Sequence, residues 1–272
     1  MTPSLSERVA AARWYHTIDL PGGIATPGHF DHRPVVGRIP MPESLAGMRC
    51  LDVGTWDGFW AFEMERRGAA EVVAVDLADP AQWDWPPHTG GGMQANQRAY
   101  LEYVKSGDSA FAIARAALGS KVERRALSVY DLTPAAVGEF DFAFLGTLLM
   151  HLRDPVRALA ALRSVCRGEA VIADGVDAIP SYLRPRTPAA RLEGLSEPWW
   201  WQPSRAGLHR MVESAGWTIT QRTGVYFLPL GVAHPRPPVG WATLRALASA
   251  QGRERLIVRF RGVPHAAVRA VP

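Results

Sequence analysis

The stretch LDVGTWDG, residues 51–58, decides the fold of this chain. It has the pattern of a short buried strand that ends in a glycine turn and continues into a helix. The next apolar run ends at Asp76, 24 residues after Asp52. A strand, a glycine turn, a helix and a second strand make one βαβ unit, so the stretch predicts a parallel sheet.

The rest of the chain continues this alternation. Apolar runs rich in β-branched residues predict parallel strands at 49–53, 71–76, 123–129, 140–145 and 170–174. Apolar residues at helical spacing predict helices over 59–67, 155–166 and 204–215. Alternating residues over 217–228 and 255–260 predict a late antiparallel pair, joined through a helix at 243–249. We expect an α/β, Rossmann-like, seven-stranded mostly parallel sheet with an antiparallel final strand and helices on both faces.

The 272 residues are expected to form a single domain, because no repeat or low-complexity linker divides them. Three additions decorate it: an N-terminal arm or cap (1–45) and lid-like insertions at 80–120 and 178–204. Ligands of open α/β sheets bind beyond the carboxyl ends of the strands, where such additions act as lids.

Composition narrows the class of protein. With 47% hydrophobic and 21% charged residues, the chain is neither disordered nor fibrous, and no apolar run is long enough to cross a bilayer. The net charge of +4 rests on arginine, since only Lys105 and Lys121 are lysines. Such an arginine excess also arises from codon bias, so it is weak support for a nucleic-acid partner. Cys50 and Cys166 have no metal or redox spacing, and no export signal opens the chain, so we expect a cytoplasmic protein.

The glycine turn itself predicts a nucleotide-like cofactor. Gly54 and Gly58 let the backbone approach a ligand, and Asp76 can accept hydrogen bonds from both ribose hydroxyls. A dinucleotide-binding turn needs a further glycine where this chain has Trp56, and Asp57 places a negative charge where a diphosphate would lie. The residues therefore favour a cofactor with a cationic amino-acid end.

The turn resembles motif I of class I S-adenosylmethionine-dependent methyltransferases, D-x-G-x-G-x-G, with Trp56 in place of the second glycine. Segments 14–20, 144–155 and 201–217 are similar to one branch, the tRNA wobble-uridine carboxymethyltransferases. Members of that branch recognise a carboxylated cofactor through a lysine and a tyrosine. This chain has His16 and Met150 at those places, so we expect ordinary S-adenosylmethionine.

The resemblance implies the residues that hold the cofactor. The methionine part would lie against the motif I loop, the ribose against the acid after the second strand, and the adenine between the second and third strand ends. The residues so implied are Asp52, Gly54, Thr55, Asp57, Gly58, Asp76, Leu77, Val129, Tyr130 and Gly146. Arg33 is a further candidate, as a partner of the cofactor carboxylate, although a solvated loop arginine is the alternative.

Histidines are the candidate catalytic groups. His151 follows the fourth strand, where an imidazole could take the proton of a hydroxyl acceptor; the alternative is a helix cap. His16, His29 and His32 lie in the arm, and His16 is the second catalytic candidate. A His-x-x-His spacing in a Gly/Pro loop lacks the helical geometry that would converge two ligands, so no metal is expected.

Aromatic and basic groups are candidates for the acceptor site. Three successive tryptophans cannot all face one core, so at least one should line a cleft, although lid packing is the alternative. The candidate acceptor residues are Tyr15, His29, Arg153, Trp199, Trp200 and Trp201, with Trp83 and Trp85 as possible further walls. The arginines at 253, 255, 259 and 261 fit a solvated face of the last strand better than a phosphate track.

Taken together, the sequence predicts a methyltransferase that acts on a hydroxyl of a small or medium-sized acceptor, such as a glycoside or a natural-product intermediate. A tRNA-modifying enzyme and a protein that binds the cofactor without methylating are the alternatives. A small-molecule partner is expected, a nucleic acid is second, and a membrane is not expected. The acceptor and the oligomeric state are not predicted.

Overall fold

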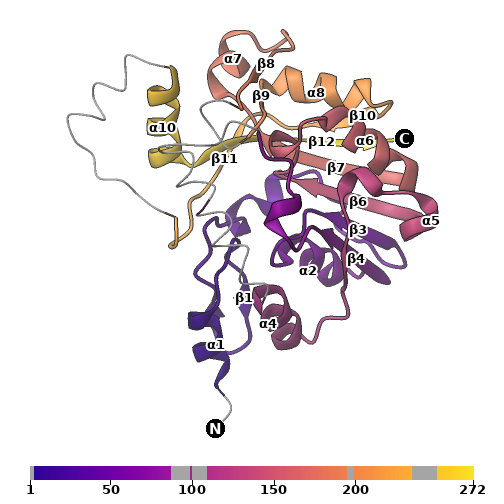
Figure 1. Ribbon diagram of the computed structural model, residues 1–272, viewed down its shortest axis with the longest axis vertical. Helices are drawn as coiled ribbons and strands as arrows, with labels where there is room; N and C mark the ends of the chain where they lie inside the picture. Colours follow the sequence, from indigo (N-terminus) through magenta and orange to yellow (C-terminus); the bar gives the residue numbers. More distant parts are fainter. Residues whose placement is uncertain (1–2, 87–98, 100–108, 195–198, 235–249) are drawn as a thin grey trace.

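One mixed sheet forms the centre of the computed structural model, which describes residues 3–86, 99, 109–194, 199–234 and 250–272. In spatial order its strands are β10 (Thr218–Arg222), β12 (Val263–Val271), β7 (Cys166–Gly175), β6 (Phe140–Gly146), β3 (Arg49–Val53), β4 (Glu71–Asp76) and β5 (Glu123–Ala126), and β11 (Tyr226–Leu228) pairs with β12. The strands from β7 to β5 pair in parallel, and β12 runs antiparallel to β7, β10 and β11. This confirms the Rossmann-like α/β fold with antiparallel final strands (Figure 1).

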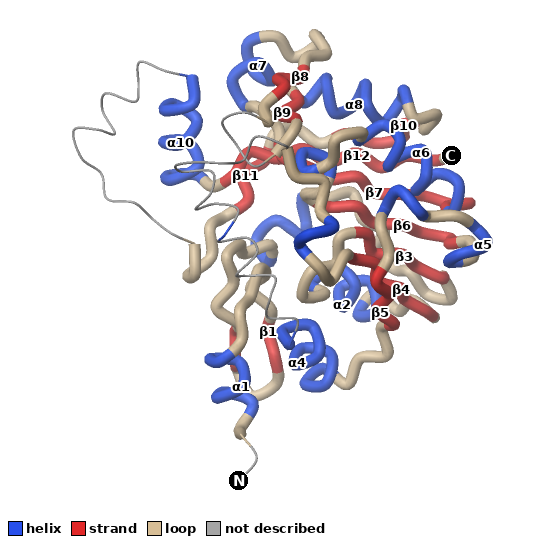
Figure 2. Tube along the Cα trace, viewed as in Figure 1, coloured by secondary structure: helices blue, strands red, loops and turns tan. Residues whose placement is uncertain are grey.

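Helices cover both faces of the sheet, as expected (Figure 2). One face carries α2 (Phe59–Arg66), α4 (Ser109–Leu118) and α1 (Leu5–Ala11), and the other carries α5 (Pro134–Val137), α6 (Pro155–Val165) and α8 (Arg205–Ser214). Successive side chains of a strand point to opposite faces. In β3, Cys50 therefore joins the first core and Leu51 the second.

The N-terminal arm is built into the first core. It contains β1 (Asp19–Leu20), β2 (Ile24–Ala25) and the 3₁₀ helix η1 (Arg33–Arg38). Trp14, Ile18 and Leu45 are buried in the same cluster as α2 and α4. In Figure 1 the arm lies beside the carboxyl ends of the parallel strands, with α1 farthest from the sheet.

Short elements surround that same edge. These are η2 (Pro80–Gln82), η3 (Val129–Asp131), η4 (Leu149–His151), α7 (Ala178–Leu183) and the hairpin β8 (Ala190–Leu192) with β9 (Trp201–Pro203). Both expected insertions contribute to this group. From Ser109 onward, however, the 80–120 segment is the core helix α4, whose Phe111 and Ala114 are buried.

The expected strand at 255–260 is wrong, because those residues lie in the helix α10 (Ala250–Arg261). Arginine, leucine, alanine and glutamine are good helix formers, and a six-residue alternation is too short to exclude a helix. The final strand is Val263–Val271, so the arginines at 253, 255, 259 and 261 lie in helix α10 and not on the last strand. The helix expected at 243–249 lies outside the described residues.

Two other strands also end earlier than expected. The alternating stretch 217–228 divides into β10 and β11, so the central sheet has eight strands where seven were expected. The third parallel strand ends at Ala126, and Val129 and Tyr130 belong to η3. No helix in the described part of the chain combines the length and the apolar character needed to span a bilayer.

Candidate functional site

The candidate site lies where the order of the strands reverses. β3 pairs with β4 on one side and with β6 on the other, so the loops that follow β3 and β6 face each other at the carboxyl edge. They approach closely: a Cβ on Gly54 would lie 3.4 Å from Cδ2 of Leu148. Such a switch point is where open α/β sheets bind their ligands.

The turn after β3 has the backbone that its glycines predict. Gly54 and Gly58 have φ values of 79° and 95°, a region that side chains disfavour. Trp56 also has a positive φ, of 50°, and its N–H donates to Oδ2 of Asp76 at 2.7 Å. Its ring stacks on Tyr15 of the arm, with 4.5 Å between centroids. This bond and this stacking hold a tryptophan where the motif has a glycine.

Two side-chain oxygen atoms of this turn are buried and have no described partner that meets hydrogen-bond geometry. Asp52 is 1% exposed, and within the described residues neither its Oδ2 nor Oγ1 of Thr55 has a hydrogen-bond partner. Burial raises the pKa of Asp52 to about 7. Unpaired buried polar groups are costly, and an acidic group beside a hydroxyl suits a cationic, hydrogen-bonding ligand. The ammonium of an S-adenosylmethionine methionine part fits this pair.

The expected ribose and adenine residues lie at the ends of the next two strands. Asp76 ends β4, is half-buried, and already accepts the Trp56 N–H through one oxygen. Leu77 follows it directly and is also half-buried. Val129 is buried in η3, where the hydroxyl of Tyr130 donates to Oδ2 of Asp84 at 2.9 Å. The strand ends thus gather these residues on one side of the motif I turn.

Asp57 holds the arm. It is 1% exposed, and its Oδ2 accepts the N–H groups of Tyr15 and His16 at 2.8 Å each. Its Oδ1 pairs with Nδ1 of His16. The Asp57 carboxylate therefore hydrogen-bonds to the N-terminal arm, at Tyr15 and His16. Gly58 starts α2, and a Cβ there would lie 2.6 Å from the ring of Phe62.

A row of aromatic rings begins at Tyr15, which Asp57 holds through its N–H. Trp56 contacts Trp83 edge-to-face at 5.6 Å between centroids, and Trp83 stacks on Trp85 at 5.2 Å. With Tyr15, these three rings form a row from the arm across the motif I turn to the segment after β4. Trp83 and Trp85, expected as possible walls of the acceptor site, are thus joined to the motif I turn through Trp56.

His151 lies in η4, directly after the β6 loop. Burial lowers the pKa of its half-buried imidazole to about 4, so the ring is neutral at pH 7. No other described side chain hydrogen-bonds to that ring. Gly146, at the end of β6, has no room for a side chain, because a Cβ would lie 2.6 Å from the ring of Phe144.

The arm histidines lie in an aromatic environment. The ring of His16 packs against Tyr15, His32 and Phe59. His29 packs on His234 with 4.1 Å between centroids, and burial lowers the pKa of His29 to about 3. Burial also lowers the pKa of His32. Among the described residues, no three His, Cys, Asp or Glu side chains are placed to hold a metal ion.

Asp174 is a site residue that sequence reasoning missed. It is fully buried near the end of β7, and its Oδ2 accepts the N–H groups of Leu148 and Leu149 at 2.9 and 2.7 Å. Burial raises its pKa to about 6. Thr147, with a φ of 51°, contacts Nε2 of His265 through Oγ1 at 3.2 Å. These contacts fix the backbone that carries His151, and an acidic residue inside the apolar run VIADG was the available signal.

The third tryptophan group lies against the same loop. The backbone N–H of Trp200 donates to the carbonyl of Met150 at 2.8 Å, and its indole N–H donates to the carbonyl of Asp84. The indole of Trp201 donates to the carbonyl of Arg153 at 3.1 Å. Trp199 differs, because its buried Nε1 has no partner among the described residues. Trp199 is therefore the member of this group whose indole N–H is not used by another described residue.

Arg153 and Arg33 have partners within the chain. The guanidinium of Arg153 lies 5.6 Å from the ring of Trp200. Arg33 donates to both oxygens of Asp31, at 2.9 and 2.7 Å, and to Asp19 at 2.5 Å. Its guanidinium links Asp19 and Asp31 within the arm. Arg33 therefore fits the alternative of a loop arginine better than that of a partner for the cofactor carboxylate.

Comparisons with known proteins agree with this geometry. The sequence model of a family described as "Methyltransferase domain" matches residues 34–222. The ubiquinone biosynthesis O-methyltransferase of Bordetella avium (strain 197N) is 32% identical over 122 residues, which are 44% of this chain and 39% of that protein. The chain therefore matches well under half the length of that relative.

Two solved structures of low sequence identity are also similar to this chain. An S-adenosylmethionine-dependent methyltransferase from Mesorhizobium loti is 14% identical, with 88% of this chain and 96% of that chain covered and a TM-score of 0.46. The Burkholderia thailandensis 1,6-didemethyltoxoflavin-N1-methyltransferase, bound to its substrate and S-adenosylhomocysteine, is 15% identical, with 83% and 71% covered and a TM-score of 0.43.

The family match covers well over half of the chain, including the motif I turn and the strands on both sides of it. The buried, unpaired groups at that turn fit the cofactor of such a family. The chain belongs to the methyltransferase domain family of class I S-adenosylmethionine-dependent methyltransferases, and S-adenosylmethionine is its cofactor.

Proposed function

We propose that this protein transfers the methyl group of S-adenosylmethionine to a hydroxyl oxygen of a small or medium-sized acceptor, with His151 as the proton acceptor. The observation that carries the proposal is the neutral imidazole without a described partner, in the loop that faces the cofactor turn. The match to a protein named as an O-methyltransferase supports an oxygen acceptor.

The residues of the motif I turn bind and orient the cofactor in this proposal. Asp52 and Thr55 hold the amino-acid end, and the carboxylate of Asp76 at the end of β4 accepts hydrogen bonds from the ribose hydroxyls. When bound, the cofactor supplies an electrophilic methyl group on a sulfonium. The protein's contribution is then to position the acceptor oxygen and to remove its proton.

His151 suits the removal of that proton by position and by protonation state. A hydroxyl held within about 3 Å of an imidazole nitrogen can pass its proton to the ring as its oxygen becomes the nucleophile. Asp174 keeps the loop in place through its bonds to the N–H groups of Leu148 and Leu149. His16 is the second candidate; its ring is already oriented by Asp57 and enclosed by aromatic rings.

The acceptor would lie beside the η4 loop and the segment 199–201. Trp200 ties these two parts together through the carbonyl of Met150. The unpaired indole N–H of Trp199 is the donor available to a hydroxyl or glycosidic oxygen. A sugar-bearing or aromatic acceptor matches this combination of a ring face and one donor.

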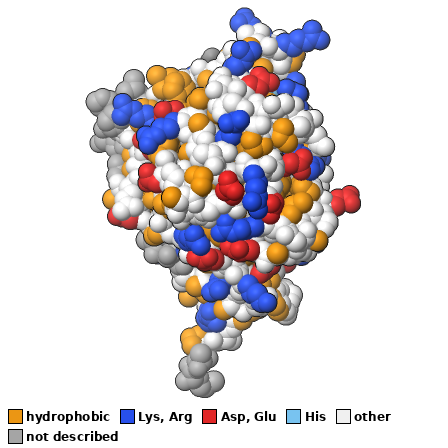
Figure 3. All heavy atoms as spheres, turned by 90° about the vertical axis from the view of Figure 1, so that its right-hand side faces the viewer, with side chains coloured by type: hydrophobic (Ala, Val, Ile, Leu, Met, Phe, Trp, Pro, Cys, Tyr) orange, Lys and Arg blue, Asp and Glu red, His pale blue; other side chains and the backbone are white. Residues whose placement is uncertain are grey.

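A tRNA acceptor, suggested by the wobble-uridine branch, has less support. On the face seen in Figure 3, basic and acidic side chains alternate. At the amino ends of the strands, opposite the candidate site, Arg49 pairs with Glu71 and Arg167 pairs with Asp141. Such pairing leaves no continuous basic track on that face for a phosphate backbone.

A labelled-methyl assay tests the proposal. The purified chain is incubated with methyl-labelled cofactor and a cell extract, and product is separated into RNA and small-molecule fractions. We expect label in small molecules that resists mild alkali, as an ether does, and little label after His151→Gln. Label confined to RNA, to alkali-labile esters, or to no fraction would contradict the proposal. The His16→Gln variant tests the second candidate in the same assay.

A further inference from the structure

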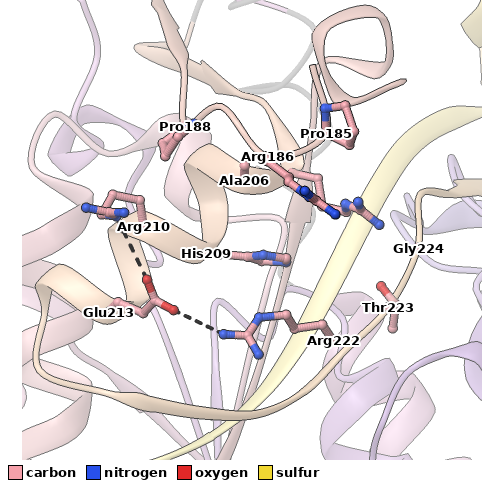
Figure 4. Close-up of a pocket in the computed structure, with 11 residues that line it drawn as sticks. Pro185, Arg186, Pro188, Ala206, His209, Arg210, Glu213, Arg222, Thr223 and Gly224 are labelled. Atoms are coloured by element: carbon pink, nitrogen blue, oxygen red, sulfur yellow. Dashed lines mark hydrogen bonds and ion pairs between the residues drawn. The ribbon is translucent and has the colours of Figure 1, made fainter. Parts of the chain in front are cut away.

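A cluster of arginines lines a cleft that the proposed methyl transfer does not use. The cleft has a volume of about 440 Å³ and lies between α8, the segment after α7 and the turn between β10 and β11. Figure 4 shows the side chains that line it. The basic ones are Arg186, Arg205, His209, Arg210 and Arg222, and Glu213 is the acidic one.

The charges of the cleft are unbalanced. Glu213 pairs with Arg222 at 3.1 Å and approaches Arg210 at 3.9 Å, so one carboxylate serves two guanidinium groups. Arg186 and Arg205 have no ion pair with any described residue. By contrast, Arg269 on the neighbouring strand β12 is paired with Glu169.

Two donor atoms are buried at the wall of the cleft. Nε of Arg205 and Nε2 of His209 are inaccessible to solvent and have no hydrogen-bond partner in the described structure. A buried polar atom without a hydrogen-bond partner is unfavourable unless a ligand or a water molecule supplies that partner. In Figure 4, the ring of His209 projects from α8 toward the space between Arg186 and Arg222.

We propose that this cleft binds the phosphoryl group of a small phosphorylated molecule, at a site separate from the methyl-transfer site. Guanidinium groups recognise phosphate oxygens through paired N–H donors, and four arginines line this open cleft, of which Arg186 and Arg205 have no ion pair with a described residue. Its size and its proline walls, Pro185 and Pro188, suit a compact ligand rather than an extended polynucleotide.

The titration of His209 supports a positive potential in the cleft. Burial, followed by the charges of Arg222 and Arg205, lowers the pKa of its imidazole to about 4. A bound phosphate dianion would oppose the effect of those arginines, so the pKa of His209 should rise when ligand binds. This gives a local signal that binding elsewhere on the protein would not produce.

Inorganic pyrophosphate is the probe, followed by calorimetry and by the imidazole resonance of His209. We expect Arg205→Gln and Arg186→Gln each to weaken pyrophosphate binding about tenfold, the loss of one charge-assisted contact. Arg184→Gln, two residues from Arg186 but outside the cleft, is the matched control and should stay within about twofold. All three variants should bind S-adenosylhomocysteine like the wild type, which shows that they are folded.

The outcomes are distinct. A rise in the pKa of His209 with pyrophosphate, and weaker binding only in the two cleft variants, supports the proposal. Equal binding in all variants would overturn it, because the anion would then bind elsewhere. Binding of tRNA that depends on Arg186 and Arg205, without pyrophosphate binding, would also overturn it in favour of an RNA surface. Because cofactor binding is measured separately, failure here leaves the methyl-transfer proposal standing.

Discussion

The Asp52→Asn substitution should abolish a proton release that accompanies cofactor binding. Asp52 is buried, one of its oxygens is unpaired, and burial raises its pKa to about 7. An ammonium group placed beside it favours the ionised carboxylate, so binding drives off the proton. With a pKa of about 7, roughly three quarters of a proton should leave at pH 6.5.

The same reasoning fixes the pH dependence of affinity. A raised carboxylate pKa means that the binding-competent, ionised form is lost as the pH falls through about 7. Affinity for S-adenosylhomocysteine should therefore fall roughly tenfold from pH 8 to pH 6. In Asp52→Asn it should vary little with pH and be weaker at pH 8 by about tenfold or more, because a buried charge-assisted contact is gone.

Calorimetry in two buffers of different ionisation enthalpy measures both quantities. S-adenosylhomocysteine is the ligand, because it carries the same amino-acid end without a transferable methyl group. Glu139→Gln, an exposed carboxylate that pairs with Arg167 at the opposite edge of the sheet, is the matched control and should behave like the wild type. Proton release that persists in Asp52→Asn would refute the assignment of Asp52 to the cofactor ammonium.

Three further predictions concern other groups of the site. Replacing His151 with Gln should lower kcat by about 10²- to 10⁴-fold with little effect on cofactor affinity, measured with labelled cofactor. Trp199→Phe should raise the KM for the acceptor about fivefold or more, because the buried indole donor is lost, while cofactor affinity stays unchanged. Neutral buried histidines should make the protein less stable as the pH falls from about 6.5 toward 4, because the unfolded chain binds protons that the native state does not. His265, with a pKa lowered to about 4 by burial, should alone contribute about 3 kcal/mol of this loss at pH 4, and urea unfolding of His265→Gln measures it.

Each of these predictions has a contrary result. Full activity of the His151 variant would exclude it as the base. A weaker cofactor affinity with unchanged acceptor KM in the Trp199 variant would move that residue to the cofactor side. An unfolding free energy of the His265 variant that depends on pH as steeply as that of the wild type would show that other groups cause the loss.

The sequence predicted the glycine turn and the strand ends beside it because these signals are local. Glycines that need a positive φ, and an acid at the end of the following strand, lie within 25 residues of one another. Parallel strands bring their carboxyl ends to one edge, so the placement of Asp52 and Asp76 follows from the strand pattern alone.

The supporting contacts could not be predicted in the same way. Asp174 binds backbone N–H groups about 25 residues earlier in the chain, which no side-chain pattern encodes. Asp57 holds the arm rather than lying free at the turn, because the arm returns to it across more than 40 residues. Basic and apolar residues alternate from 255 to 260, which predicts a strand. The structure has helix α10 there, so this prediction is wrong.

Transfer of labelled methyl to a small molecule, with and without the His151 imidazole, tests the account most directly. Wild-type protein incubated with methyl-labelled S-adenosylmethionine and cell extract should place label in an alkali-stable small-molecule product. The His151→Gln variant should bind S-adenosylhomocysteine normally but transfer at least about 100-fold more slowly. Equal transfer by both proteins, or label found only in RNA, would contradict the account.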